Sequence, residues 1–220
     1  MDIIIAAKYG NAFDVRNSIH LFINRIDLED EKSALHYAAE NGDIEIVDIL
    51  LKYGANINIV NSYNITPLHY AIKNNHFNVV KLLIENGADI EIDGDEYSTP
   101  LCTACGSIGE CNLEIAKYLL DKGSKINESL HHSSIFEHFE IVKLLIQYGA
   151  DINAQSYRGT PLHCACSVGN FEIVKLLIEN GADINAKDLD GKTPLYSSSN
   201  PDEEIVKYFL DKGANNLIKK

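Results

Sequence analysis

One short motif recurs along the chain and constrains its fold more than any other feature. Two apolar residues, often Leu-Leu or Leu-Ile, are followed by two variable residues, a glycine and a small residue. The glycines of this motif are Gly54, Gly87, Gly123, Gly149, Gly181 and Gly213. Successive glycines lie 33, 36, 26, 32 and 32 residues apart. A period near 33 residues predicts a solenoid, in which each repeat packs only on its neighbours.

A second element lies upstream of most of these glycines. It reads Ser33-Ala34-Leu35-His36, Thr66-Pro67-Leu68-His69, Thr99-Pro100-Leu101-Cys102, Thr160-Pro161-Leu162-His163 and Thr193-Pro194-Leu195-Tyr196. Thr66 is a good N-cap and Pro67 suits the first helical position, so a helix should begin there. A second apolar stripe then predicts a second helix that ends at Gly87. Helices this short are marginal alone, so the repeats must stack.

The two elements together resemble the ankyrin repeat over nearly the whole chain. The resemblance implies an all-α fold, an ankyrin-repeat solenoid of about seven helix-turn-helix repeats with short β-like finger turns. We expect one domain, 1–220, with repeats at 1–28, 29–61, 62–94, 95–124, 125–155, 156–188 and 189–220. In the first, capping repeat, Ile4–Asn11 reads like Leu35–Gly42 with the helix-cap signals missing.

The pattern breaks around the fifth repeat. Glu128–Val142 aligns without a gap onto Thr66–Val80, but Glu128 follows Gly123 by 5 residues, whereas Thr66 follows Gly54 by 12. The inter-repeat finger is therefore 7 residues shorter, and we expect a notch and a weak junction there. The preceding repeat carries 3 extra residues within 106–112, a place where repeat proteins tolerate or use insertions.

Charge and cysteine content narrow the classes of function. The net charge is −13, which disfavours binding to nucleic acid or anionic membranes and suits a partner with a basic surface. The amino terminus lacks the basic region of a secretory signal, and no apolar run is long enough to span a bilayer. The 5 cysteines are an odd number in two bunches, so we expect free thiols and a cytoplasmic monomer.

Neither the cysteines nor the histidines form a convincing reactive site. Cys105 and Cys166 lie six residues after the repeat threonine, where other repeats carry small or apolar core residues. His36, His69, His131 and His163 share one repeat position. In ankyrin repeats the histidine at this position links neighbouring repeats, which implies a structural role. We therefore predict no metal, no cofactor and no enzymatic activity.

The remaining candidates for function lie on the face that the fold does not need. By resemblance to ankyrin repeats, a concave surface of finger tips and first helices binds a protein partner. The residues predicted to contribute are Tyr37, Tyr63, Ile65, Tyr70, Lys73, Asn74, Asp95, Glu96, Tyr157, Arg158, Leu189, Asp190 and Lys192. Tyrosine and arginine are typical anchors of protein interfaces. Acidic residues at 27–31 and 89–96 are either solvated turns or groups that steer a basic partner.

The predicted function is non-enzymatic binding of a protein, as an adaptor or a stoichiometric inhibitor. One alternative is a scaffold that positions a catalytic or membrane module, although the repeats occupy the whole of the given sequence. Another is a secreted effector of an intracellular microbe or virus. Fold alone does not decide among them.

Overall fold

The computed structural model describes residues 2–19, 22–94, 99–106, 111–126, 128–197 and 203–214. These residues form helices in pairs, a shorter first helix and a second helix. The pairs are α1 Ile3–Lys8 and α2 Ala12–Ser18, α3 Ala34–Asn41 and α4 Ile44–Lys52, α5 Pro67–Lys73 and α6 Phe77–Glu85, α7 Pro100–Ala104 and α8 Leu113–Asp121, α9 Ser129–Ile135 and α10 Phe139–Gln147, α11 Pro161–Val168 and α12 Phe171–Glu179, and α13 Pro194–Ser197 and α14 Glu203–Asp211. Within the described ranges, extended pairing is limited to isolated bridges such as Ser156 with Gly159. The all-α prediction is confirmed.

The helix boundaries follow from the residues at each end. Thr66 is extended and caps α5, because its Oγ1 accepts the backbone N–H of His69 at 3.4 Å while Pro67 begins the helix. Gly87 follows α6 with φ of +91°, a left-handed conformation that glycine adopts without strain. This lets the N–H of Ala88 donate to the carbonyl of Leu83 and close the last turn.

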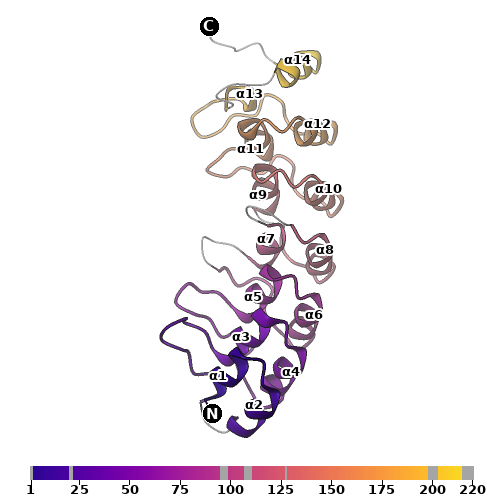
Figure 1. Ribbon diagram of the computed structural model, residues 1–220. Coiled ribbons are helices and arrows are strands. Elements are labelled where there is room, and N and C mark those ends of the chain that lie inside the picture. The colour runs from indigo at the N-terminus through magenta and orange to yellow at the C-terminus, as the bar shows by residue number, and fades with distance from the viewer. Residues whose placement is uncertain are drawn as a thin grey trace. The chain divides into compact units, whose positions relative to one another are not determined.

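The chain forms two compact units. Unit 1 comprises Met1–Ala104 and Glu114–Lys125, and unit 2 comprises Cys105–Leu113 and Ile126–Lys220. In unit 1 the first helices α1, α3, α5 and α7 lie in one row, with the second helices beside them (Figure 1). In unit 2 α9, α11 and α13 form the corresponding row, beside α10, α12 and α14.

Each unit buries a core at equivalent repeat positions. In the first helices the same leucine recurs two residues after the capping position, and it is at most 2 % exposed as Leu35, Leu68, Leu101, Leu130 and Leu162. In the second helices the matching position is fully buried as Val47, Val80, Ala116, Val142 and Val174. Stacked apolar faces of this kind supply most of the stability of short helices.

Asparagine side chains, which the sequence patterns did not single out, tie successive inter-repeat loops together. Asn24 Oδ1 accepts the N–H of Asn56 at 2.7 Å, and Asn58 Oδ1 accepts that of Asp89 at 2.9 Å. In unit 2 Asn153 does the same for Asp183 at 2.8 Å. These bonds satisfy backbone N–H groups of the inter-repeat loops, which have no partner within a helix.

The first repeat corrects one prediction. Asp2 caps α1, since its Oδ1 accepts the N–H of Ile4 at 2.9 Å, so a cap signal is present after all. The alignment is also displaced by one residue: Gly10, with φ of +68°, matches Gly42, with φ of +77°. The sequence misled because Asp2 is an N-cap residue that lacks the Thr-Pro signature of the other repeats.

Candidate binding surface

The fingers are loops that lead into the first helices. In each unit they project from the row of first helices, away from the second helices (Figure 1). We define four of them by residues 27–32, 61–65, 156–159 and 188–192. Each is closed by a backbone hydrogen bond across its base: Asp27 N to Lys32 O at 2.8 Å, Asn61 N to Ile65 O at 3.2 Å, Ser156 N to Gly159 O at 2.9 Å, and Asp188 N to Lys192 O at 2.9 Å. The tips are therefore presented on closed loops.

Repeated histidines connect each first helix to the finger of the next repeat. His36 Nε2 lies 3.0 Å from Ile65 O, and His163 Nε2 lies 3.0 Å from Lys192 O. The other nitrogen of His36, Nδ1, accepts the backbone N–H of Ser33 at 3.0 Å. A neutral ring with its proton on Nε2 satisfies both contacts, and burial lowers the pKa of His36 to about 4. The bridging role that the resemblance implied is confirmed at these positions.

A further bridging histidine was missed in the sequence. His76, in the turn before α6, has Nε2 at 2.9 Å from the carbonyl of Glu40 in the preceding repeat. Its ring lies so close to Gly42 that a Cβ there would meet the ring at 2.6 Å. Gly42 was therefore the sequence signal for this bridge, because a residue without a side chain leaves room for a histidine ring from the next repeat.

In unit 1 the tyrosine proposed as an anchor at position 37 is buried, which corrects that assignment. Tyr37 is only 3 % exposed, and its hydroxyl donates to Asp30 Oδ2 at 2.5 Å. Lys8 pairs with the same carboxylate at 2.6 Å. Burial, then the Asp30 carboxylate, raises the pKa of Tyr37 above its ordinary range. Tyr37 thus holds the 27–32 finger in place and offers no exposed face to a partner.

Tyr70 continues this cluster into the next repeat. The ammonium of Lys32 lies 4.7 Å from the Tyr70 ring centroid and 5.4 Å from that of Tyr37, and it pairs with Glu40 at 2.7 Å. Tyr70 is half-buried, and so is Ile65, whose carbonyl accepts from His36. Both therefore have part of their surface available.

Three predicted residues of unit 1 are exposed. Tyr63, on the 61–65 finger, is 60 % exposed, and Lys73 and Asn74 stand exposed at the end of α5. Asn74 donates only within its own helix, from Nδ2 to Tyr70 O at 2.9 Å. Asp95 and Glu96 lie outside the described residues.

Unit 2 presents its predicted residues on two neighbouring fingers. Tyr157 is 70 % exposed and Leu189 is 81 % exposed. Arg158 is also exposed, and its Nε donates to the Tyr157 hydroxyl at 2.7 Å. Asp190 and Lys192 are exposed and pair with each other at 3.3 Å. The side chains of Tyr157, Arg158 and Leu189 are thus not needed for the core.

The acidic groups of unit 1 largely support its own fingers. Asp27 and Asp30 accept from Tyr37, and Glu31 accepts the hydroxyl of Ser62 in the next finger. Glu91 Oε1 accepts the N–H of Lys125 at 3.0 Å. Glu29, Asp89 and Asp93 remain exposed. Much of the acidic run therefore has a structural task that the sequence did not reveal.

Most of the cysteines lie in the core. Cys105 and Cys166 are at most 1 % exposed, as expected of core residues, and burial raises the pKa of the Cys164 thiol to about 11. In the part of the chain that the structure describes, no three His, Cys, Asp or Glu side chains converge as metal ligands would. Nor does any described helix have the length and apolar character to cross a membrane.

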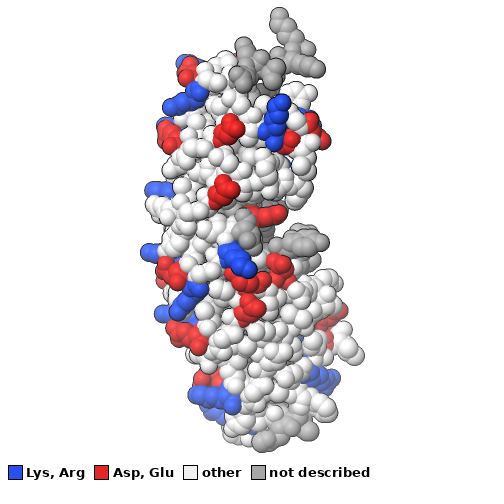
Figure 2. All heavy atoms as spheres, turned by 180° about the vertical axis from the view of Figure 1, so that it is seen from behind, with Lys and Arg blue, Asp and Glu red and all other residues white. Residues whose placement is uncertain are grey.

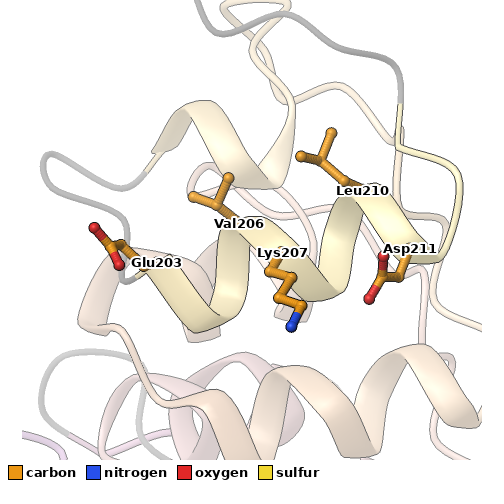
Figure 3. A pocket seen from close by; sticks show the side chains of 5 residues that line it. All are labelled: Glu203, Val206, Lys207, Leu210 and Asp211. Carbon is orange, nitrogen blue, oxygen red and sulfur yellow. The ribbon is translucent and has the colours of Figure 1, made fainter.

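The second helices show mixed charge, and α14 carries an open recess. In each unit, Lys and Arg alternate with Asp and Glu along the edge formed by the second helices (Figure 2). The recess is lined by Glu203, Val206, Lys207, Leu210 and Asp211, all from α14 (Figure 3). A recess walled by one helix brings no polar groups together from different elements, so it is a helix face rather than a ligand pocket.

Known families and proteins match this architecture. A family model described as ankyrin repeats (3 copies) matches residues 3–94, 60–129, 91–156 and 130–220. Among curated proteins, the ankyrin repeat protein FPV232 of fowlpox virus (strain NVSL) is 42% identical over 155 residues, which is 66% of this chain and 32% of that protein. The E3 ubiquitin-protein ligase XBAT32 of Arabidopsis thaliana is 41% identical over 68 residues, 26% of this chain and 13% of that protein. The chain thus spans about a third or less of these relatives.

Solved structures match over almost the whole chain. The human ASB11 ankyrin repeat domain has a TM-score of 0.81 at 24% identity, covering 98% of this chain and 99% of that one. The ankyrin repeat domain of Bcl-3, a member of the IkappaB protein family, has a TM-score of 0.83 at 25% identity, covering 96% of this chain and 98% of that one. Stacked helix pairs, bridging histidines and matching family models agree, and the chain belongs to the ankyrin-repeat family.

Proposed function

We propose that this chain binds another protein through its finger tips and the exposed ends of its first helices, without catalysing a reaction. The observation that carries the proposal is the exposure of large side chains on the fingers: Tyr63, Tyr157 and Leu189 are 60 %, 70 % and 81 % exposed. Aromatic and apolar groups held on closed loops supply contact area at small cost in conformational entropy. Such a chain acts as an adaptor or as a stoichiometric inhibitor.

The chemistry of the partner follows in part from charge. With a net charge of −13, the chain attracts basic surfaces over long range and repels phosphate backbones. Glu29, Asp89 and Asp93, which are exposed acids in the loops of unit 1, support steering of a basic partner toward that unit. None of the 5 cysteines forms a disulfide, which suits a monomer that works in a reducing cytoplasm.

A second candidate function rests on the relatives. The Arabidopsis relative is named as an E3 ubiquitin-protein ligase, and the present chain corresponds to 13% of it. In that setting the repeats would select a protein on which a separate catalytic module acts. The fowlpox relative, of which this chain covers 32%, is a viral ankyrin repeat protein, which agrees with the alternative of a secreted effector of a virus. In both cases the repeats themselves bind protein.

Capture from a native lysate tests the proposal. The immobilised chain should retain specific proteins, and Tyr63→Ala combined with Tyr157→Ala should reduce retention. Lys175→Ala, on the exposed face of α12, is the matched control and should leave retention unchanged. A basic partner steered by unit 1 should be retained less at high salt, because exposed charges are screened. Retention lost equally in the control, or no specific retention at all, would contradict the proposal.

A further inference from the structure

The 156–159 finger of unit 2 carries an arginine that differs from the other arginines of the chain. The sequence contains three arginines. Arg16 pairs with Glu45 at 2.7 Å, and Arg25 pairs with Asp2 at 2.8 Å. No carboxylate among the described residues forms an ion pair with Arg158, although the chain carries 32 acidic residues.

Arg158 is also held in a defined position. Its Nε donates to the Tyr157 hydroxyl at 2.7 Å, and its guanidinium carbon lies 5.1 Å from the centroid of the Tyr157 ring. Nε is therefore occupied by Tyr157. The two terminal nitrogens of the guanidinium are not paired with a carboxylate of the described residues. A guanidinium binds a carboxylate through two parallel N–H donors, and prior ordering reduces the entropy lost on binding.

The base of this finger is fixed to the neighbouring first helix. His131 Nε2 lies 2.9 Å from the carbonyl of Ala154 and 3.1 Å from that of Gly159. Gly159 adjoins Arg158, so this contact fixes the backbone next to the arginine.

Carboxylates lie near the base of this finger without pairing with Arg158, since Glu128 acts together with Arg158 on the Cys164 thiol and Asp151 acts on His131. His132 and His138 each have a buried ring nitrogen without a hydrogen-bond partner among the described residues. His138 and Arg158 both contribute to the lowered pKa of His132, after burial. On the adjoining finger, Asp190 is paired with Lys192.

The apolar surroundings show what else the partner must carry. The neighbouring finger lies alongside, because Gln155 Nε2 donates to Lys187 O at 3.3 Å and a Cβ on Gly159 would meet Asp188 Cβ at 3.0 Å. Its tip is Leu189, 81 % exposed, next to the tip that carries Tyr157. The surface thus combines one cation with an aromatic and an aliphatic side chain.

We propose that Arg158, Tyr157 and Leu189 form a docking surface for an extended, carboxylate-bearing segment of a protein partner, with an Asp or Glu on Arg158 and apolar neighbours on Tyr157 and Leu189. The inference rests on the proposed protein-binding function and names the chemistry of one site. A carboxylate fits better than a phosphate dianion, because a chain of net charge −13 repels the second negative charge more strongly.

The test uses the whole chain of 220 residues and a phage-displayed library of random linear peptides. A selected peptide is synthesised in three forms, with the acidic residue, with the matching amide, and with phosphoserine at that place. Fluorescence anisotropy then gives the dissociation constants. Replacing the acid by the amide should weaken binding about tenfold.

Substitutions assign that loss to the arginine. Arg158→Gln should weaken the acidic peptide about tenfold and leave the amide peptide unchanged, because the lost interaction needs both charges. Lys175→Gln makes the same change in net charge on α12 and should have no effect. Tyr157→Phe keeps the ring and removes the acceptor for Nε, so it should weaken the acidic peptide by a smaller factor. Unchanged melting curves would show that each variant folds.

The outcomes separate this inference from the general function. Arg158→Gln acting equally on both peptides, phosphoserine binding more tightly than the acid, or a library without acid-dependent binders would each overturn the carboxylate site. If captured proteins or peptides then depend on Tyr63 and Lys73, the protein-binding function stands and only this inference falls. If neither set of fingers retains protein or peptide, both fall.

Discussion

The first helices α5 and α9 begin at equivalent repeat positions but are capped differently. At α5, Thr66 is extended and His69 Nδ1 lies 2.7 Å from its hydroxyl, so cap and histidine support each other. At α9, Glu128 has ψ of 3° and makes no side-chain cap. His131 Nδ1 is consequently buried with no partner among the described residues, although its Nε2 still reaches the next finger.

The difference shows that the repeated histidine performs two separable tasks. Binding the next finger needs only Nε2, and α9 retains it. Capping its own helix needs the residue three positions earlier, and α9 has lost it together with part of the incoming finger. Ser133 and Ser134, in place of small apolar residues, also bond to carbonyls one turn back at 2.7 Å, which slightly destabilises helices.

The substitutions with the largest expected effect test whether the repeats of α5 and α9 also differ in core packing. Leu83 in α6 and Leu145 in α10 occupy the same position, and both are fully buried. Leu83→Ala and Leu145→Ala should each lower the free energy of unfolding by about 2 to 5 kcal/mol through the cavity left behind. Chemical denaturation of the two variants measures this. A much smaller cost at Leu145 would extend the difference from the caps to the packing.

Acid should destabilise the bridge made by His36, in which both ring nitrogens have hydrogen-bond partners. Burial lowers the pKa of His36 to about 4, so between its unfolded pKa near 6.5 and that value the unfolded state binds more protons. Stability is thus full at neutral pH and falls by roughly 3 kcal/mol as pH drops from about 6.5 to about 4. Urea unfolding of the native chain and of His36→Gln across this range measures the contribution. An equal pH dependence in both proteins would contradict the assignment.

Hydrogen exchange compares the two helix entrances without any substitution. The N–H of His69 donates to Thr66 Oγ1 at 3.4 Å, whereas the equivalent N–H of His131 has no cap side chain to accept it. We expect the His131 amide to exchange about tenfold faster, with the amides of Leu83 and Leu145 as references for each unit. One division between the units falls between Lys125 and Ile126, within the stretch where we expect a weak junction. Equal protection on both sides of it would argue against separate unfolding.

Restoring the missing cap gives a smaller effect of opposite sign. Glu128→Thr should raise the free energy of unfolding by about 1 kcal/mol, because the threonine can accept from the helix and face His131 Nδ1. Denaturation of this variant, beside Thr66→Ser as a cap-preserving control, measures the change. No gain would mean that the short connection from Gly123 fixes the backbone of residue 128, whichever residue stands there.

Local chemistry made much of this fold predictable from the sequence. Thr66 and Pro67 begin a helix and Gly87 ends one through their own backbone preferences, so the repeats could be located before any contact was known. The binding surface was less predictable. Tyr63 lies in a finger and Tyr37 lies within α3, and the repeat pattern predicted both to be exposed. Tyr37 is instead packed with Lys8 and Asp30, which a repeat pattern does not place.

The sequence identified Arg158 as a candidate binding residue, but it could not show that Arg158 lacks a paired carboxylate. Its exposure followed from the finger, whereas the absence of a paired carboxylate depends on side-chain positions across several loops. Long-range pairing such as Arg16 with Glu45 joins residues in different repeats, so spacing along the sequence does not identify it.

The smallest expected effect separates fold from function at a finger tip. Tyr63 is 60 % exposed, and its finger is held by the Asn61 side chain, whose Oδ1 accepts the N–H groups of Tyr63 and Ile65 at 3.0 and 2.9 Å. Tyr63→Ala should therefore change the free energy of unfolding by no more than about 0.5 kcal/mol. Tyr37→Ala, at 3 % exposure, should cost about 3 kcal/mol or more in the same denaturation experiment. Because Tyr63→Ala leaves the fold intact, any loss of captured protein in that variant reports a contact; a large loss of stability would instead place Tyr63 in the packing of unit 1.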